Sequence, residues 1–121
     1  MNWITILILA AMLVAIILLR RSGQISSQEA AAHLKRGAMV IDVRTAGEFA
    51  SGHLPNAIHL PLDEIESSLP RRVKDKNQVL LLHCQAGGRS AEASKKLIAL
   101  GYVNAFNLGS YNRTEQIVRG K

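Results

Sequence analysis

The N-terminal apolar run is the feature that most constrains the fold of this chain. Residues 3–19, WITILILAAMLVAIILL, contain no charged side chain. As a helix this run is about 26 Å long, at the short end of what crosses a bilayer core of about 30 Å. A helix packed in a globular core normally keeps a polar face, and this run has none. We therefore predict a transmembrane helix over residues 3–19.

The charges that flank this run decide between an anchor and a cleaved signal peptide. A signal peptide has positive charges before its apolar region, whereas Arg20 and Arg21 follow it here. Positive flanks stay on the cytoplasmic side of a membrane. The pattern predicts a single-pass anchor in an inner or plasma membrane over residues 1–21. Residues 22–121 are then one domain facing the cytoplasm.

The composition of the chain excludes several classes of partner and site. The net charge of +6 suits a solvated surface or an anionic membrane face. Only 4% of the residues are aromatic, so platforms for base stacking are scarce and nucleic acid is not an expected partner. A single cysteine excludes an internal disulfide and a CxxC metal site.

Apolar strand patterns alternate with helix patterns along residues 22–121. Strands are predicted at 38–42, 57–62, 79–83 and 102–109, and helices at 26–37, 45–52, 63–69, 90–101 and 110–118. This alternation predicts an α/β domain with a mostly parallel central sheet flanked by helices. In such sheets the ligand site lies beyond the carboxyl ends of the strands.

The lone cysteine stands at such a carboxyl end. Cys84 follows the apolar strand VLLLH and precedes a predicted helix. Gly87 and Gly88 allow a tight turn whose amides can point inward at an anion, and Arg89 adds a full positive charge. These features favour a thiolate, so a nucleophilic Cys84 with a lowered pKa is expected. An ordinary buried core cysteine is the alternative.

The residues around this cysteine carry a family resemblance. CQAGGRS resembles the active-site loop of rhodaneses, sulfurtransferases that carry sulfane sulfur as a cysteine persulfide. Its Cys-x-x-Gly-x-Arg form is filled by Cys84, Gly87 and Arg89. Upstream, VIDVRTAGEFASGHLPNAIHLPL resembles further signatures of the family, and the likeness extends over about residues 25–109. The resemblance implies a rhodanese-like, single-domain sulfurtransferase behind the predicted anchor.

The resemblance also implies a reaction and a set of site residues. Cys84 takes the outer sulfur of a donor such as thiosulfate and passes it to cyanide, a cellular thiol or a protein acceptor. No metal and no organic cofactor is expected. A neutral residue after the cysteine, where many thiosulfate-using members have a basic one, weakens the case for thiosulfate. The implied substrate-binding residues are Gln85, Ala86, Gly87, Gly88, Arg89 and Ser90.

Two upstream residues are expected to support the loop. Asp42 is expected to accept loop N–H groups or to pair with Arg89, with a plain turn-capping role as the alternative. Arg44 is expected to pair with a carboxylate such as Glu48, with substrate binding as the alternative. Arg89 itself is either a ligand of the substrate anion or a brace of the loop.

Two other functions compete with sulfur transfer. One is a membrane-localised binding or redox-sensing module with a rhodanese fold and no turnover. The other is a phosphatase or arsenate reductase. Four residues separate Cys84 from Arg89, whereas five separate the equivalent residues in the related dual-specificity phosphatases. The shorter loop favours a bound sulfur atom over a tetrahedral phosphate.

Overall fold

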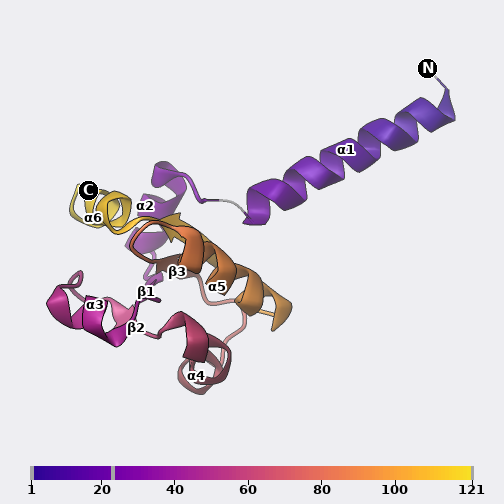
Figure 1. Cartoon of the computed structure of the whole chain (residues 1–121). Coiled ribbons are helices and arrows are strands. Elements are labelled where there is room, and N and C mark those ends of the chain that lie inside the picture. The colour runs from indigo at the N-terminus through magenta and orange to yellow at the C-terminus, as the bar shows by residue number, and fades with distance from the viewer. Residues whose placement is uncertain (1, 23, 121) are drawn as a thin grey trace.

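The computed structural model describes residues 2–22 and 24–120, with the backbone alone for residues 17–22. Its strands and helices alternate along the chain after the first helix (Figure 1). The strands are β1 (Met39–Asp42), β2 (Ile58–His59), β3 (Leu80–His83) and β4 (Ala105–Gly109). The helices are α1 (Trp3–Ser22), α2 (Ser27–Lys35), α3 (Ala46–Ser51), the 3-10 turn η1 (Leu62–Glu64), α4 (Ile65–Arg72), α5 (Gly88–Ala99) and α6 (Tyr111–Arg119).

The four strands form one parallel sheet in the order β2-β1-β3-β4. The register places Asp42 beside both His59 and His83, and His83 beside Gly109. Because all strands run the same way, their carboxyl ends meet at one edge of the sheet. The predicted α/β fold with a parallel sheet flanked by helices is confirmed.

A separate apolar core lies on each face of the sheet. Successive side chains of a strand point to opposite faces, so Leu80 and Leu82 share one face with Cys84 while Leu81 points to the other. The first core joins β1 and β3 to α4 and α5 and contains Ile41, Val43, Leu60, Ile65, Leu69, Val73, Leu80, Leu82, Cys84, Ala93, Leu97, Tyr102 and Ala105. The second lies against α2 and α6 and contains Ile25, Ala30, Leu81, Leu108 and Ile117.

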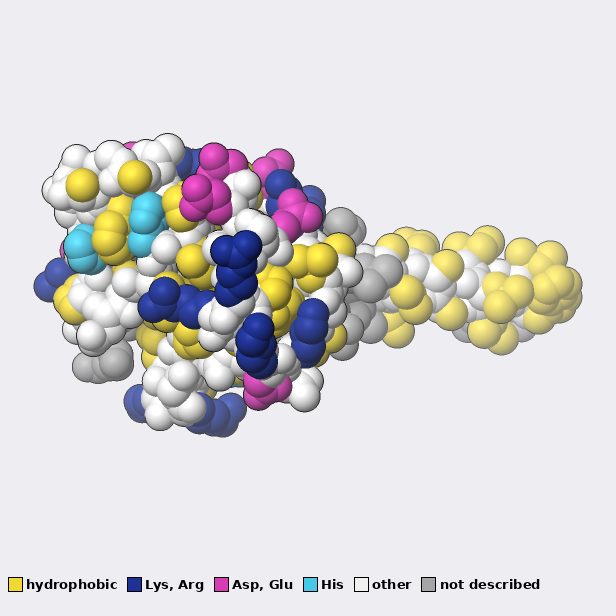
Figure 2. Space-filling view, turned by 90° about the horizontal axis from the view of Figure 1, so that it is seen from below, with side chains coloured by type: hydrophobic (Ala, Val, Ile, Leu, Met, Phe, Trp, Pro, Cys, Tyr) yellow, Lys and Arg dark blue, Asp and Glu magenta, His cyan; other side chains and the backbone are white. Residues whose placement is uncertain are grey.

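Helix α1 extends away from the sheet (Figure 1) and carries mostly apolar side chains, while charged side chains of both signs lie on the face of the domain that Figure 2 shows. Trp3 at its start is 69% exposed. Among the described residues, no helix is both long and apolar enough to cross a membrane. The transmembrane helix predicted over residues 3–19 is therefore not supported.

Several predicted element ends differ from the structure. The helix predicted to end before Pro70 continues to Arg72. Proline removes one amide donor, but Leu69 is fully buried and holds this turn against the sheet, and the Val73 amide donates to the Leu69 carbonyl. The last strand begins at Ala105 and not at Tyr102, whose amide instead closes the end of α5 by donating to Leu97.

The burial of β3 gives a first prediction. Leu82→Ala deletes a fully buried side chain from the first core, and we expect it to lower the free energy of unfolding by about 2–5 kcal/mol. Leu100→Ala makes the same chemical change at a site that is 37% exposed and should change it by less than about 0.5 kcal/mol. Urea denaturation followed by circular dichroism measures both. Equal losses would contradict the assignment of Leu82 to the core.

Candidate active site

Cys84 lies directly after β3, with its side chain on the α5 face of the sheet. Its amide donates to the carbonyl of Gly109 at 3.2 Å, which continues the pairing of β3 with β4 by one residue. The side chain is almost fully buried, at 1% exposure. Its Sγ nevertheless accepts a hydrogen bond from the Gly87 amide at 2.9 Å and lies 3.5 Å from the Ser90 hydroxyl. The sulfur thus faces polar donors of the loop as well as the core.

The shape of the loop depends on Gly87. This residue has a φ of 104°, in the left-handed region that side chains disfavour, and it forms the N-terminal cap of α5. A Cβ at this position would lie 3.4 Å from the Cα of Gly109. Helix α5 begins at Gly88, two residues before the predicted start. The early start brings the positive end of the helix dipole close to the sulfur.

The electrostatic surroundings of Cys84 favour its thiolate. Burial alone raises the pKa of the thiol, but hydrogen bonds from the Ser90 hydroxyl and from the Ser90, Gly87 and Ala86 amides lower that pKa below its usual value. The hydroxyl carries one hydrogen and lies nearer, at 2.6 Å, to Asn107 Oδ1. The amides are therefore the steadier donors to the sulfur.

Asn107 in β4 holds the middle of the loop. Its Oδ1 accepts hydrogen bonds from the Ser90 hydroxyl at 2.6 Å and from the Gly109 amide at 2.9 Å. Its Nδ2 donates to the Gly87 carbonyl at 3.3 Å. The sequence analysis missed this residue. A buried amide inside an otherwise apolar strand was the signal that would have identified it.

The start of the loop is joined to the start of α6. Ala86 and Ser110 form an isolated antiparallel bridge. The Tyr111 amide donates to the Gln85 carbonyl at 3.2 Å. Together with Asn107, these contacts fix the loop from the β4 side.

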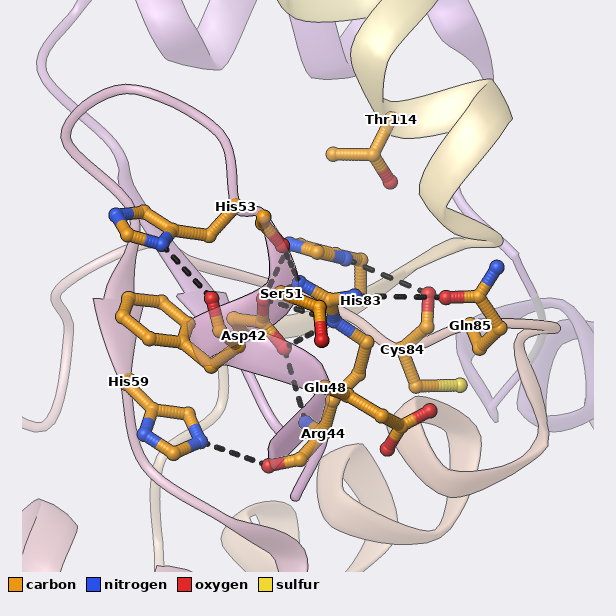
Figure 3. A network of polar contacts seen from close by, with 12 residues as sticks. Asp42, Arg44, Glu48, Ser51, His53, His59, His83, Cys84, Gln85 and Thr114 are labelled. Atoms are coloured by element: carbon orange, nitrogen blue, oxygen red, sulfur yellow. Dashed lines mark hydrogen bonds and ion pairs between the residues drawn. The ribbon is translucent and has the colours of Figure 1, made fainter. Parts of the chain in front are cut away.

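Asp42 and Arg44 form a buried ion pair beside the loop (Figure 3). Both carboxylate oxygens of Asp42 accept from the guanidinium, at 2.8–3.0 Å, and Oδ1 also accepts from the Arg44 amide. The remaining guanidinium donors reach the Gly52 carbonyl at 2.7 Å and the Gln85 side-chain oxygen at 3.4 Å. Asp42 therefore acts on the loop through Arg44. Among the described residues, Asp42 makes neither of the expected contacts, acceptance of loop amides or pairing with Arg89, because Arg44 occupies both oxygens. The bond from the Arg44 amide agrees instead with the turn-capping role named as the alternative.

His83 lies on the opposite side of the strand from the thiol. Its ring is fully buried, with its edge against Tyr111, and Arg44 stacks over the same tyrosine ring at 4.6 Å. Its Nε2 is 3.7 Å from Asp42 Oδ2 and has no hydrogen-bond partner among the described residues. Burial lowers the pKa of His83, so the imidazole is neutral at physiological pH. In Figure 3 the sulfur of Cys84 points away from this cluster.

Arg89 pairs with Glu48, the carboxylate that the sequence analysis assigned to Arg44. The contact is bidentate, with Nη1 to Oε1 at 2.6 Å and Nη2 to Oε2 at 3.0 Å. Glu48 is the third residue of α3 and also closes a capping box with Thr45, whose amide donates to Oε1 at 3.0 Å. The side chain of Arg89 is thus directed toward α3.

Of the predicted substrate-binding residues, Gln85, Ala86 and Gly87 lie in the turn between β3 and α5, and Gly88, Arg89 and Ser90 form the first turn of α5. Gln85, Ala86 and Gly88 are exposed, Gly87 and Arg89 are half-buried, and Ser90 is buried. Within residues 2–22 and 24–120, no group of three His, Cys, Asp or Glu side chains is placed to hold a metal ion. The chemistry that this site offers is that of a stabilised thiolate.

The donors around the sulfur predict its titration. Alkylation of Cys84 by iodoacetamide requires the thiolate, so the rate should rise with pH through an inflection below that of cysteine in an unstructured peptide measured in the same way. Ser90→Ala removes one donor and should move the inflection to higher pH. Ser94→Ala, one turn along α5, removes a hydroxyl that donates to Ala105 and not to the sulfur. It should leave the inflection in place, and an inflection in the unaltered protein at or above that of the peptide would contradict the assignment.

Comparison with known proteins agrees with this geometry. The family model of the rhodanese-like domain matches residues 26–115. Thiosulfate sulfurtransferase PspE of Escherichia coli is 35% identical over 69 residues, which are 57% of this chain and 66% of PspE. Human thiosulfate:glutathione sulfurtransferase is 32% identical over 61% of this chain and 76% of its own length.

A solved structure shows the same fold. A rhodanese with anions from E. coli superimposes with a TM-score of 0.61 at 31% identity, covering 64% of this chain and 91% of the other. The match to PspE spans just under two thirds of that protein. The family model, by contrast, covers most of the present sequence, including both β1 and the loop around Cys84. The chain therefore belongs to the family of proteins with a rhodanese-like domain.

Proposed function

We propose that this protein is a sulfurtransferase that carries sulfur as a persulfide on Cys84. The observation behind the proposal is the set of loop donors that converge on a buried sulfur, with the Gly87 amide at 2.9 Å. A sulfur atom added to Cys84 would extend the thiolate by one atom, and the anionic charge would move to that outer sulfur. Amides fixed by a helix start and by Asn107 are preorganised to stabilise such an anion.

The transfer takes place in two balanced steps. The Cys84 thiolate attacks the outer sulfur of the donor, so that a new S–S bond forms and the electron pair of the old bond leaves with the remainder. With thiosulfate as donor, that remainder is sulfite. A thiophilic acceptor such as cyanide or a thiol then attacks the outer sulfur and restores the thiolate. Neither step requires an external oxidant or reductant.

The relatives support a sulfurtransferase more strongly than they support any one substrate. Proteins named thiosulfate sulfurtransferase and thiosulfate:glutathione sulfurtransferase are 35% and 32% identical to this chain. Thiosulfate is named for those proteins. In this chain it is one candidate donor, and a cellular thiol or a protein is a candidate acceptor.

Mass spectrometry of the intact protein tests the proposal. Incubation with thiosulfate or another sulfane donor should add one sulfur atom, and peptide mapping should place it on Cys84. Cyanide should then remove it and release thiocyanate. Cys84→Ser keeps the size of the side chain and should gain no sulfur. An unaltered mass with every sulfane donor would sink the proposal and would favour a rhodanese-fold module that binds a partner without turnover.

The localisation predicted from the sequence, in an inner or plasma membrane with the domain in the cytoplasm, stays a prediction. The unaltered chain should then sediment with membranes and resist extraction by alkaline carbonate. Arginine near the middle of a membrane helix costs about 2.5–3.5 kcal/mol, so Leu9→Arg combined with Leu13→Arg should move the protein to the supernatant. If the unaltered chain and the double variant both stay in the supernatant, the predicted membrane localisation is refuted.

A further inference from the structure

We propose that Glu48 makes this site selective for sulfur donors of low negative charge, by neutralising the arginine of the loop. The inference rests on the sulfur transfer proposed above and names the class of donor that the site accepts best. It treats Glu48 as a specificity-determining residue that acts through Arg89 and does not touch the transferred sulfur.

The first step of the argument is the geometry of the ion pair. Both terminal nitrogens of Arg89 are bonded to the two oxygens of Glu48, at 2.6 and 3.0 Å. A bidentate pair of this kind fixes the guanidinium in one orientation. Thr45 holds the carboxylate in turn, with its amide and its hydroxyl donating at 3.0 and 3.1 Å. The arginine is therefore bound from a short helix that is itself capped.

The second step is the charge that this pair leaves near Cys84. The hydrogen bonds to Glu48 raise the pKa of Arg89 most, and the nearby charge of Cys84 raises it further. The hydrogen bonds from Arg89, followed by those from Thr45, lower the pKa of Glu48 to about 2. The carboxylate is therefore ionised throughout the neutral range and balances the charge of Arg89. An incoming anion meets the amide dipoles of the loop and an ion pair whose net charge is zero.

The third step is the groove beside Arg89. This groove has a volume of about 310 Å³ and is lined by Val43, Thr45, Pro61, Leu62, Asp63, Arg89, Glu92 and Lys96. Both of its cations have carboxylate partners, since Arg89 pairs with Glu48 and Lys96 lies 3.3 Å from Glu66. Asp63 and Glu92 add two further carboxylates to the lining. A donor that reaches past Arg89 into this groove would therefore gain little from carrying negative charge there.

The neutral side chain that follows Cys84 also gives no advantage to a highly charged donor. Gln85 directs its Oε1 to Arg44 at 3.4 Å, and the charge of Arg44 is balanced by Asp42. Arg44 and Arg89 are thus each matched by a carboxylate. Thiosulfate carries two negative charges, and the remainder that leaves after transfer of its outer sulfur is a sulfite dianion. Thiosulfate is therefore disfavoured relative to a monoanionic donor that transfers the same sulfur.

Two donors with one chemistry test this inference. Thiosulfate and methanethiosulfonate both transfer an outer sulfur from a sulfonyl group, leaving sulfite or methanesulfinate, and they differ by one negative charge. Glu48→Gln removes the carboxylate charge while retaining a side chain that can complete a capping box. We expect kcat/KM for thiosulfate to rise at least about fivefold at low ionic strength, mainly through a lower KM. The value for methanethiosulfonate should rise much less.

Glu115→Gln is the matched control. Glu115 also pairs with an arginine, Arg119, at 3.4 Å, and its substitution changes the net charge by the same unit far along α6. In Glu115→Gln, the ratio of kcat/KM for thiosulfate to kcat/KM for methanethiosulfonate should equal the ratio in the unaltered protein. A ratio unchanged by Glu48→Gln, or an equal fall in both values, would overturn the inference, because a purely structural role affects the two donors alike.

The unaltered protein supplies a second measurement that does not depend on the folding of any variant. Because Glu48 balances the charge of Arg89 in the unaltered protein, kcat/KM for thiosulfate should change by less than about twofold between low and physiological salt concentrations. A steep fall with salt would show an uncompensated cation at the site and would also overturn the inference. Failure of the protein to acquire a persulfide from either donor would instead refute the proposed sulfur transfer itself.

Discussion

The hydrogen bond from the Gly87 amide to the sulfur of Cys84 is the contact on which the rest of the site depends. It exists because the chain leaves a buried strand, turns through a left-handed glycine and starts a helix within four residues. A buried thiol without such donors would have a raised pKa and would be inert. The neighbouring strand β4 supports this turn with the backbone of Gly109 and the side-chain amide of Asn107. The parallel sheet is thus the scaffold that directs the amides of Ala86, Gly87 and Ser90 at one atom.

The sequence predicted this scaffold well, because its signals are local. Apolar runs gave the parallel strands, and the spacing of Cys84, Gly87 and Arg89 located the loop. The ends of elements were less predictable, since Leu69 holds a turn that contains Pro70 only through burial in the tertiary core. The apolar run at the start forms a helix, but its hydrophobicity suggested a membrane span that the described residues do not support.

The pairing of charges could not be derived from sequence alone. Asp42, Arg44, Glu48 and Arg89 were all identified as polar residues near the loop, yet the expected partners were exchanged. Asp42 and Arg44 are two residues apart at a strand end, where the backbone already brings the amide of one to the carboxylate of the other. Glu48 and Arg89 are 41 residues apart, so only the folded position of α3 against the loop brings them together. Asn107 was missed for the same reason, because the partners of its side chain come from α5, the loop and the end of β4.

Helix α3 connects these separate contacts into one arrangement. Its first turn presents Glu48 to Arg89, and the carbonyl of Gly52 just beyond its last turn accepts from Arg44. A six-residue helix with no buried residue of its own is held mainly by these two arginines and by the stacking of Phe49 between His53 and His59. Arg44 contacts the loop at the Gln85 side chain, and Arg89 stands at the start of α5. A displacement of α3 would therefore take Glu48 away from Arg89 and the Gly52 carbonyl away from Arg44 at the same time, which couples the charge near the thiolate to the position of a single surface helix.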